Sequence, residues 1–160
     1  MSIQAGDRMP EGSFATMTAD GPGSRSTEEL FAGKKVVLFS VPGAFTPTCS
    51  KSHLPGFVQH AAALKAKGVD TIACMSVNDV FVMDAWGRDQ GVGDDDVMRA
   101  DGTATYAEAL GLSLDATGFG MGTRGQRFAL IVADGVATQV HVEGPGEFKV
   151  SSAEAILAAL

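Results

Sequence analysis

The run from Val36 to Val41 is the sequence feature with the largest consequence for the fold. Apolar side chains fill nearly every position of this strand-length segment, which Gly33-Lys34-Lys35 precedes and Pro42-Gly43 ends. A strand with one face in water alternates apolar and polar residues, so a run without alternation predicts a strand buried on both faces. Such a strand needs layers of structure on both sides, as in the parallel or mixed sheet of an α/β protein.

The rest of the chain alternates between helix and strand patterns. Thr46 and Pro47 predict a helix start, because Thr is a good N-cap and Pro favours the first helical position. This helix is expected to reach about Lys67, with Gly68 behind it, and to kink at Pro55, whose ring removes a backbone hydrogen bond. The other expected elements are a strand over 69–77, a helix that Asn78 or Asp79 caps and that ends at about Asp89, and a short helix over about 105–110. Strands over 126–133 and 136–142 joined by Asp134-Gly135 should follow, and then a helix over 153–160 opened by a capping box of Ser151 and Glu154.

These patterns predict one domain over residues 1–160, with an α/β fold of thioredoxin-like type in which helices flank a central mixed β-sheet. The net charge of −7 argues against a nucleic-acid partner and gives no attraction to an anionic membrane surface. No stretch reaches the roughly 18 apolar residues of a spanning helix, and residues 1–7 lack the features of a secretory signal. We therefore expect a cytoplasmic protein, in which two cysteines serve packing or redox chemistry more often than a structural disulfide.

Cys49 is the residue around which chemistry is expected. With Thr46 as N-cap, Cys49 falls in the first helical turn, where unpaired N–H groups and the positive end of the helix dipole favour an anion. The anion available is the thiolate, which is the species that attacks a peroxide O–O bond and becomes a sulfenic acid. The alternative is a helix start that merely contains a buried thiol.

Thr46 and Pro42 are the neighbours expected to assist. The Thr46 hydroxyl can lie beside the sulfur and direct a peroxide, or it can cap the helix by accepting from the N–H of Thr48 or Cys49, and both roles are compatible. Pro42 adds no donor and would shield the pocket from water.

The pattern Pro42-x-x-x-Thr46-x-x-Cys49 resembles the active-site signature of the peroxiredoxins. The longer run from Val41 to Ser50 is similar to the type II, or peroxiredoxin-5-like, class and to its plant members. The resemblance continues over residues 53–57, 64–69, 76–79, 124–130 and 146–154, and so covers nearly the whole chain. It implies that Cys49 is the peroxidatic cysteine, Thr46 the peroxide-orienting hydroxyl, Pro42 the shielding proline and Arg127 the arginine that holds thiolate and peroxide. A guanidinium suits that role because it is always charged and presents a rigid fork of donors.

The resemblance also implies an activity and partners. The activity is a thiol-dependent reduction of hydrogen peroxide and alkyl hydroperoxides without a cofactor, recycled by glutaredoxin with glutathione or by thioredoxin, in a homodimer. Many relatives of this class place a resolving cysteine where this chain has Val150. That departure keeps a second hypothesis open, in which the chain is a peroxide-responsive redox sensor or binding module with incidental turnover.

Cys74 is the candidate for a resolving cysteine within the chain. It lies inside a predicted buried strand, where a cysteine is usually an inert packing residue, and packing is the interpretation that we favour. A disulfide with Cys49 would need Cα atoms within about 7 Å of each other or local unfolding of the helix.

Weaker signals concern the surroundings of the site. The Gly120–Gly125 segment matches G-x-G-x-x-G but precedes a strand, so it predicts a loop and no nucleotide site. Arg124 is the weaker candidate of the two arginines, with a solvated side chain as the alternative, and His53 either tunes Cys49 or is a buried hydrogen-bonded histidine. His60 and His141 have no metal-ligand spacing, and Asp94–Asp96 predict a solvated acidic loop. The candidates for lining the peroxide pocket are Gly43, Phe45, Thr48, Phe119 and Met121, and no metal is expected.

Overall fold

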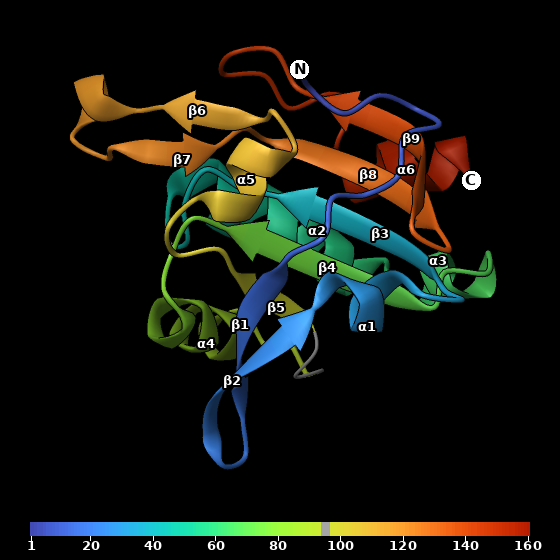
Figure 1. Ribbon diagram of the computed structural model, residues 1–160, viewed down its shortest axis with the longest axis horizontal. Helices are drawn as coiled ribbons and strands as arrows, with labels where there is room; N and C mark the ends of the chain where they lie inside the picture. Colours follow the sequence, from blue (N-terminus) through green and yellow to red (C-terminus); the bar gives the residue numbers. More distant parts are fainter. Residues whose placement is uncertain (94–96) are drawn as a thin grey trace.

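The computed structural model describes residues 1–93 and 97–160. Its main sheet contains seven strands in the order β2-β1-β5-β4-β3-β8-β9, and a separate two-stranded sheet, β6-β7, projects from the body (Figure 1). The neighbours β3, β4 and β5 are parallel, whereas β1, β2, β8 and β9 pair antiparallel with their neighbours. The strands are β1 (Ser13–Thr18), β2 (Gly21–Ser26), β3 (Lys35–Ser40), β4 (Thr71–Ser76), β5 (Met98–Ala100), β6 (Ser113–Asp115), β7 (Thr123–Gly125), β8 (Phe128–Ala133) and β9 (Val136–Val142).

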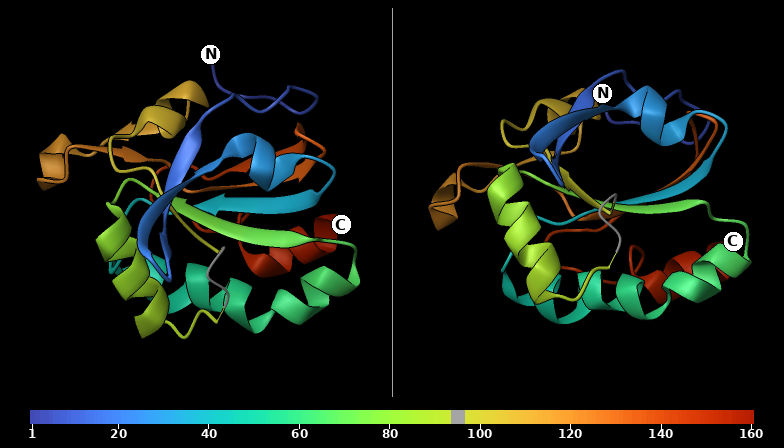
Figure 2. Two further views of the ribbon diagram at one scale, coloured as in Figure 1. Left: turned by 60° about the horizontal axis from the view of Figure 1, so that its bottom comes forward. Right: turned by 90° about the horizontal axis from the view of Figure 1, so that it is seen from below.

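Helices cover both faces of the main sheet. Figure 2 shows α2, α3, α4 and α6 beneath one face, and α1 and α5 with the N-terminal segment on the other. The helices are α1 (Thr27–Phe31), α2 (Leu54–Gln59), α3 (Ala61–Ala66), α4 (Val80–Asp89), α5 (Thr105–Ala109) and α6 (Ala153–Ala159), with a π-helical turn at Cys49–His53 and a 3-10 turn at Thr117–Phe119. The prediction of an α/β fold with a mixed central sheet is confirmed.

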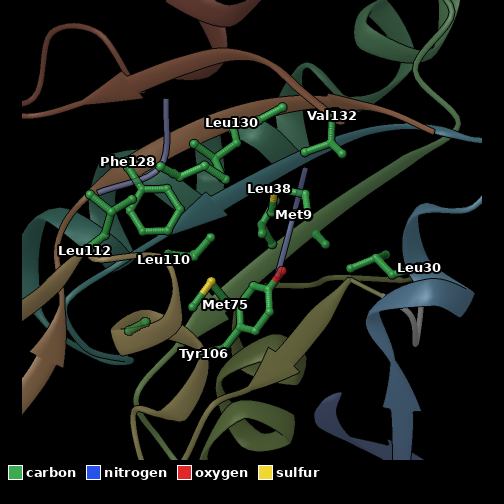
Figure 3. Packing of buried hydrophobic residues seen from close by; sticks show 14 of the residues in the cluster. Met9, Leu30, Leu38, Met75, Tyr106, Leu110, Leu112, Phe128, Leu130 and Val132 are labelled. Atoms are coloured by element: carbon green, nitrogen blue, oxygen red, sulfur yellow. The ribbon is translucent and has the colours of Figure 1, made fainter. Parts of the chain in front are cut away.

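Strand β3 is buried on both faces, as its unbroken apolar run predicts. Val36 and Leu38 pack into the core on the side of α1 and α5, where Figure 3 shows Leu38 among its neighbours. Val37 and Phe39 pack into the second core, on the side of α2, α4 and α6. Alternate side chains of a strand point to opposite faces, so this one segment anchors both halves of the interior.

The helix after β3 differs from the prediction. Instead of one helix to Lys67 with a kink at Pro55, the chain forms the π-helical turn, then α2, then α3 after a break at His60. In the π-helical turn the N–H of Leu54 reaches back to the carbonyl of Cys49. Pro55 therefore lies in the first turn of α2, where its missing N–H costs little. The end of α3 agrees with the prediction, because Gly68 has a φ of 95°.

The cap of α6 and two N-terminal elements also differ from the prediction. Ser152, and not Ser151, caps α6 by accepting from the N–H of Ala155, so the predicted capping box is wrong. The β1-β2 hairpin and α1 were not predicted. The Asp134-Gly135 turn is confirmed by positive φ at both residues, whereas Asp94–Asp96 lie outside the described residues. Among the helices that the structure describes, none is long and apolar enough to cross a membrane.

Candidate active site

Cys49 lies where the chain leaves the carboxyl end of β3 and enters its first helical turns. Its side chain is fully buried. Strand β8 runs antiparallel to β3, and their register pairs Phe128, at the start of β8, with Ser40, at the end of β3. This register brings Arg127, the residue before β8, to the same edge of the sheet as Cys49. Nη2 of Arg127 donates to Sγ of Cys49 over 3.1 Å.

Arg127 is held by two further contacts. Its Nη1 lies 2.9 Å from Nδ1 of His53, and its guanidinium carbon lies 5.8 Å from the centre of the Phe148 ring. A planar guanidinium that places one nitrogen on His53 and the other on Cys49 has little freedom to rotate. The arrangement places a permanent positive charge against the sulfur of Cys49.

His53 is buried and hydrogen-bonded at both ring nitrogens. Nε2 lies 2.9 Å from the carbonyl oxygen of Ser151, which can only accept, so Nε2 carries the proton and Nδ1 accepts from Arg127. Burial, with the charge of Arg127, lowers the pKa of His53 from 6.5 to about 3. The histidine is therefore neutral near pH 7 and adds no charge to the site.

Thr46 makes a different hydrogen bond from the capping bond considered from the sequence. Its hydroxyl donates to the carbonyl of Gly43 over 2.6 Å, and no backbone N–H of the described residues donates to its oxygen. The backbone carbonyl of Thr46 accepts from Ser50 and so begins the helix. Because the hydroxyl proton is donated to Gly43, the hydroxyl oxygen is available to accept a hydrogen bond from a protonated peroxide.

The loop between β3 and Cys49 is tied to the start of α4. Oδ1 of Asn78 accepts from the N–H of Ala44 (2.9 Å) and from the hydroxyl of Ser76 (2.6 Å). The sequence predicted Asn78 or Asp79 as the N-cap of α4. The structure shows that Asp79 caps the helix, because its side chain accepts from the N–H of Val82. Asn78 is therefore free to hold the loop, a role that sequence reasoning missed. Its position directly after a buried strand was the available signal.

Two aromatic residues shape the same loop. Phe45 has a φ of 65°, a left-handed conformation that is uncommon outside glycine, and its ring is 54% exposed. Trp86 of α4 faces Phe45 with 6.5 Å between ring centres, and its indole N–H donates to the hydroxyl of Ser50 over 3.0 Å. Helix α4 thus supports both ends of the segment that carries Cys49.

A cavity of about 220 Å³ opens beside Arg127. Arg127 contacts Cys49 and also lines this cavity, so a small molecule that enters it meets the guanidinium. Its wall is formed by Pro42, Thr48, Leu114, Gln126, Arg127 and residues 143–148. Pro42 and Thr48, which the sequence predicts beside the peroxide, both line this cavity.

The other candidates for the pocket lie elsewhere. Phe45, Phe119 and Met121 are not lining residues of this cavity, and Phe119 is 86% exposed near the tip of the β6-β7 extension. Gly43 lies where an added Cβ would meet the side chains of Thr46, Arg124 and Met121. Arg124 is more than a solvated neighbour, because it donates to the carbonyls of Met121 and Val77.

Cys74 is fully buried in β4, directly across from Phe39 of β3. Burial, with the nearby Cys49, raises the pKa of the Cys74 thiol well above its usual value. Both cysteines are free. A buried protonated thiol is a poor nucleophile, so the geometry favours the packing interpretation of Cys74.

Comparison with known proteins gives a consistent result. Residues 4–157 match the Redoxin family model. The chain is 50% identical to peroxiredoxin-2B of Arabidopsis thaliana over 99% of this chain and 98% of that protein. It is 40% identical to the hybrid peroxiredoxin hyPrx5 of Haemophilus influenzae over 98% of this chain and 66% of that protein. Among solved structures, reduced Prx3 of Vibrio vulnificus in complex with H2O2 superposes with a TM-score of 0.94 and 54% identity, over 98% of each chain.

Proposed function

The chain belongs to the redoxin family and, within it, to the peroxiredoxins, and we propose that Cys49, Arg127, Thr46 and Pro42 carry its thiol-dependent peroxidase reaction. Its fold is the thioredoxin-like fold expected from the sequence, its substrate is a peroxide and its reductant a thiol. The observation that supports the assignment of the site is the 3.1 Å contact between Nη2 of Arg127 and Sγ of Cys49.

In the first step the thiolate of Cys49 attacks one oxygen of the peroxide. An S–O bond forms as the O–O bond breaks, and the second oxygen leaves with its electron pair and takes a proton, as water or as an alcohol. Arg127 holds the sulfur and can donate to the departing oxygen, where charge develops. Thr46 accepts from the peroxide and fixes its direction, and Pro42 excludes water from the cavity.

In the second step a thiol reduces the sulfenic acid of Cys49. The thiolate of the reductant attacks sulfur, hydroxide leaves as water after protonation, and a second thiol releases Cys49 from the mixed disulfide. Cys74 is buried and protonated, which supports an external donor. We propose glutaredoxin with glutathione, or thioredoxin, for this role. The cytoplasm, which keeps such thiols reduced, is the compartment that fits this proposal.

The test is peroxide-dependent consumption of NADPH, coupled separately through the glutaredoxin–glutathione system and the thioredoxin system. The expected result is many turnovers with at least one donor, none in Cys49→Ser and nearly unchanged turnover in Cys74→Ser. Consumption of a single equivalent of peroxide with every donor would favour the redox sensor instead. Loss of turnover in correctly folded Cys74→Ser would show that the second cysteine takes part.

We also propose a homodimer. Phe45 and Phe81 are 54% and 63% exposed. Each lies within three residues of the hydrogen bond that joins Ala44 to Asn78. Large exposed aromatic side chains commonly mark association surfaces, so the proposed contact lies beside the active site.

A further inference from the structure

The two terminal nitrogens of Arg127 have different partners. Nη2 donates to Cys49 over 3.1 Å, and Nη1 donates to Nδ1 of His53 over 2.9 Å. The guanidinium is rigid and planar, so fixing the direction of one nitrogen fixes the direction of the other. The orientation of Arg127 toward the sulfur therefore depends on where the ring of His53 stands.

The ring of His53 is itself fixed. Its Nε2 donates to the carbonyl of Ser151 over 2.9 Å. Three aromatic rings surround it, with centres 4.9 Å away at Phe39, 5.6 Å at Phe57 and 5.0 Å at Phe148. A fully buried ring with both nitrogens bonded and three aromatic neighbours has one available orientation.

The Ser151 carbonyl that accepts from His53 belongs to a backbone segment held by one carboxylate. The buried side chain of Glu143 accepts from the backbone N–H groups of Lys149, Val150 and Ser151, at 2.8–2.9 Å, and from the Ser151 hydroxyl at 2.6 Å. Although burial raises the pKa of Glu143, these hydrogen bonds outweigh it and lower the pKa, so the carboxylate is charged near pH 7. A continuous series of contacts thus runs from Glu143 through Ser151, His53 and Arg127 to Cys49.

We propose that His53 is a positioning residue for peroxide reduction, a neutral hydrogen-bond acceptor that directs Arg127 at Cys49 without cancelling its charge. A carboxylate at this place could hold the guanidinium equally well. It would also pair with the positive charge and weaken the attraction of Arg127 for the thiolate. A buried imidazole with an unprotonated Nδ1 accepts the same hydrogen bond without adding a negative charge. The proposal rests on the peroxidase chemistry of Cys49 and adds a residue to it.

The proposal is tested first by single substitutions, with the pH dependence of Cys49 alkylation by iodoacetamide and the rate of peroxide reduction as readouts. His53→Leu removes the acceptor and should move the alkylation midpoint to higher pH and slow peroxide reduction by about tenfold to a hundredfold. His53→Gln, whose amide can accept from Arg127 and donate to Ser151, should recover most of both. His53→Glu should also move the midpoint upward, because it adds a negative charge. His60→Leu, at the surface, is the matched control and should change neither.

A double-mutant cycle separates positioning from general packing. In an Arg127→Ala background, His53→Leu should have no further effect on alkylation or on peroxide reduction, because its effect passes through the arginine. An equal effect in both backgrounds would overturn the proposal, and so would a wild-type alkylation profile in folded His53→Leu. The alkylation readout needs no turnover, so it distinguishes a failure of this proposal from a failure of the peroxidase assignment.

If His53→Leu does not fold, NMR of the wild-type protein and of Arg127→Ala still tests the proposal. Nitrogen-15 NMR of the histidine rings should show His53 as the neutral Nε2–H tautomer throughout pH 5–8, and its Nδ1 signal should shift in Arg127→Ala. A proton on Nδ1, titration of His53 within that range, or an unchanged Nδ1 signal would contradict the proposal.

Discussion

At the scale of single residues, one arginine joins the parts of the site. Arg127 contacts the sulfur of Cys49, a neutral histidine and an aromatic ring, and it lines a cavity of about 220 Å³. The resemblance to peroxiredoxins predicted Cys49 and Arg127 as residues of one site. The sequence also named His53 as a candidate, but it did not indicate that His53 contacts Arg127. Spacing along the chain cannot reveal that His53 meets Arg127, because the two are 74 positions apart and are joined by the pairing of β3 with β8.

Replacing Arg127 with Ala should slow the reaction of Cys49 with peroxide at neutral pH by about a hundredfold, since one donor to developing charge is commonly worth that much. The rising limb of the pH–rate profile should also move to higher pH. Stopped-flow measurement of the reaction between pH 5 and 9 checks both. A profile with an unchanged rising limb would count against the assigned role of Arg127.

His53 should also affect the dependence of stability on pH. Its pKa is about 3 in the folded chain and 6.5 without the protein environment. Between these values the unfolded chain binds a proton at His53 that the folded chain does not bind. Stability is therefore highest above pH 6.5 and declines as the pH falls toward 3. Between pH 7 and pH 5 this one group should remove roughly 2 kcal/mol from the free energy of unfolding.

Urea unfolding at pH 7 and pH 5 measures this loss. The window lies above the range in which most carboxyl groups titrate, so it isolates histidine. His53→Gln should flatten the decline by the same amount, whereas His60→Gln should keep the wild-type dependence. An equally steep decline in His53→Gln would show that another group is responsible.

At the scale of elements, the sequence predicts best where the hydrophobic pattern is strong. The burial of β3, the end of α3 at Gly68 and the turn between β8 and β9 followed from apolar runs and glycine positions. The β1-β2 hairpin was missed because β2, Gly21–Ser26, is polar and largely exposed and therefore shows no periodicity. The π-helical turn was missed because its hydrogen bond from Leu54 to Cys49 depends on how the chain enters the core.

The hydrogen bond between Ala44 and Asn78, directly before the cap of α4, predicts a contrast between two adjacent residues. Asn78→Ala removes the acceptor of the Ala44 N–H and of the Ser76 hydroxyl, so it should lower kcat/KM for peroxide by about tenfold and reduce stability by about 1–3 kcal/mol. Asp79→Ala removes only the cap of α4, so it should cost about 1 kcal/mol of stability and leave kcat/KM unchanged.

Thermal unfolding and steady-state kinetics of the two variants check this contrast. Equal losses of activity would mean that the start of α4, and not the side chain of Asn78, holds the loop. Unchanged activity in Asn78→Ala would mean that the loop keeps its position without this hydrogen bond.

At the scale of the whole molecule, the two faces of the sheet have separate tasks. The core on the face covered by α2, α4 and α6 contains both cysteines, whereas the opposite core, beside α1 and α5, contains neither. The fold class was predictable because alternating helices and strands allow few arrangements. The surface of the proposed homodimer was not predictable, because it depends on which apolar side chains remain exposed after folding.

The proposed homodimer predicts that Phe81→Glu produces a monomer. Phe81 is exposed on α4, so the substitution should leave the fold intact while placing a charge in the contact. Sedimentation velocity at micromolar protein measures the change, and Phe119→Glu on the β6-β7 extension tests whether that surface takes part. A wild-type protein that is monomeric under these conditions would contradict the proposal.

We propose that Cys49 reduces peroxide through a sulfenic acid while Cys74 remains a thiol. Mass spectrometry of the reduced protein after one equivalent of hydrogen peroxide, with a sulfenic-acid trap and then peptide mapping, tests both statements. We expect one trap adduct, formed on Cys49 as the sulfenic oxygen leaves as water, with Cys74 unmodified and no adduct in Cys49→Ser. A disulfide between Cys49 and Cys74, or oxidation of Cys74 ahead of Cys49, would contradict the proposal.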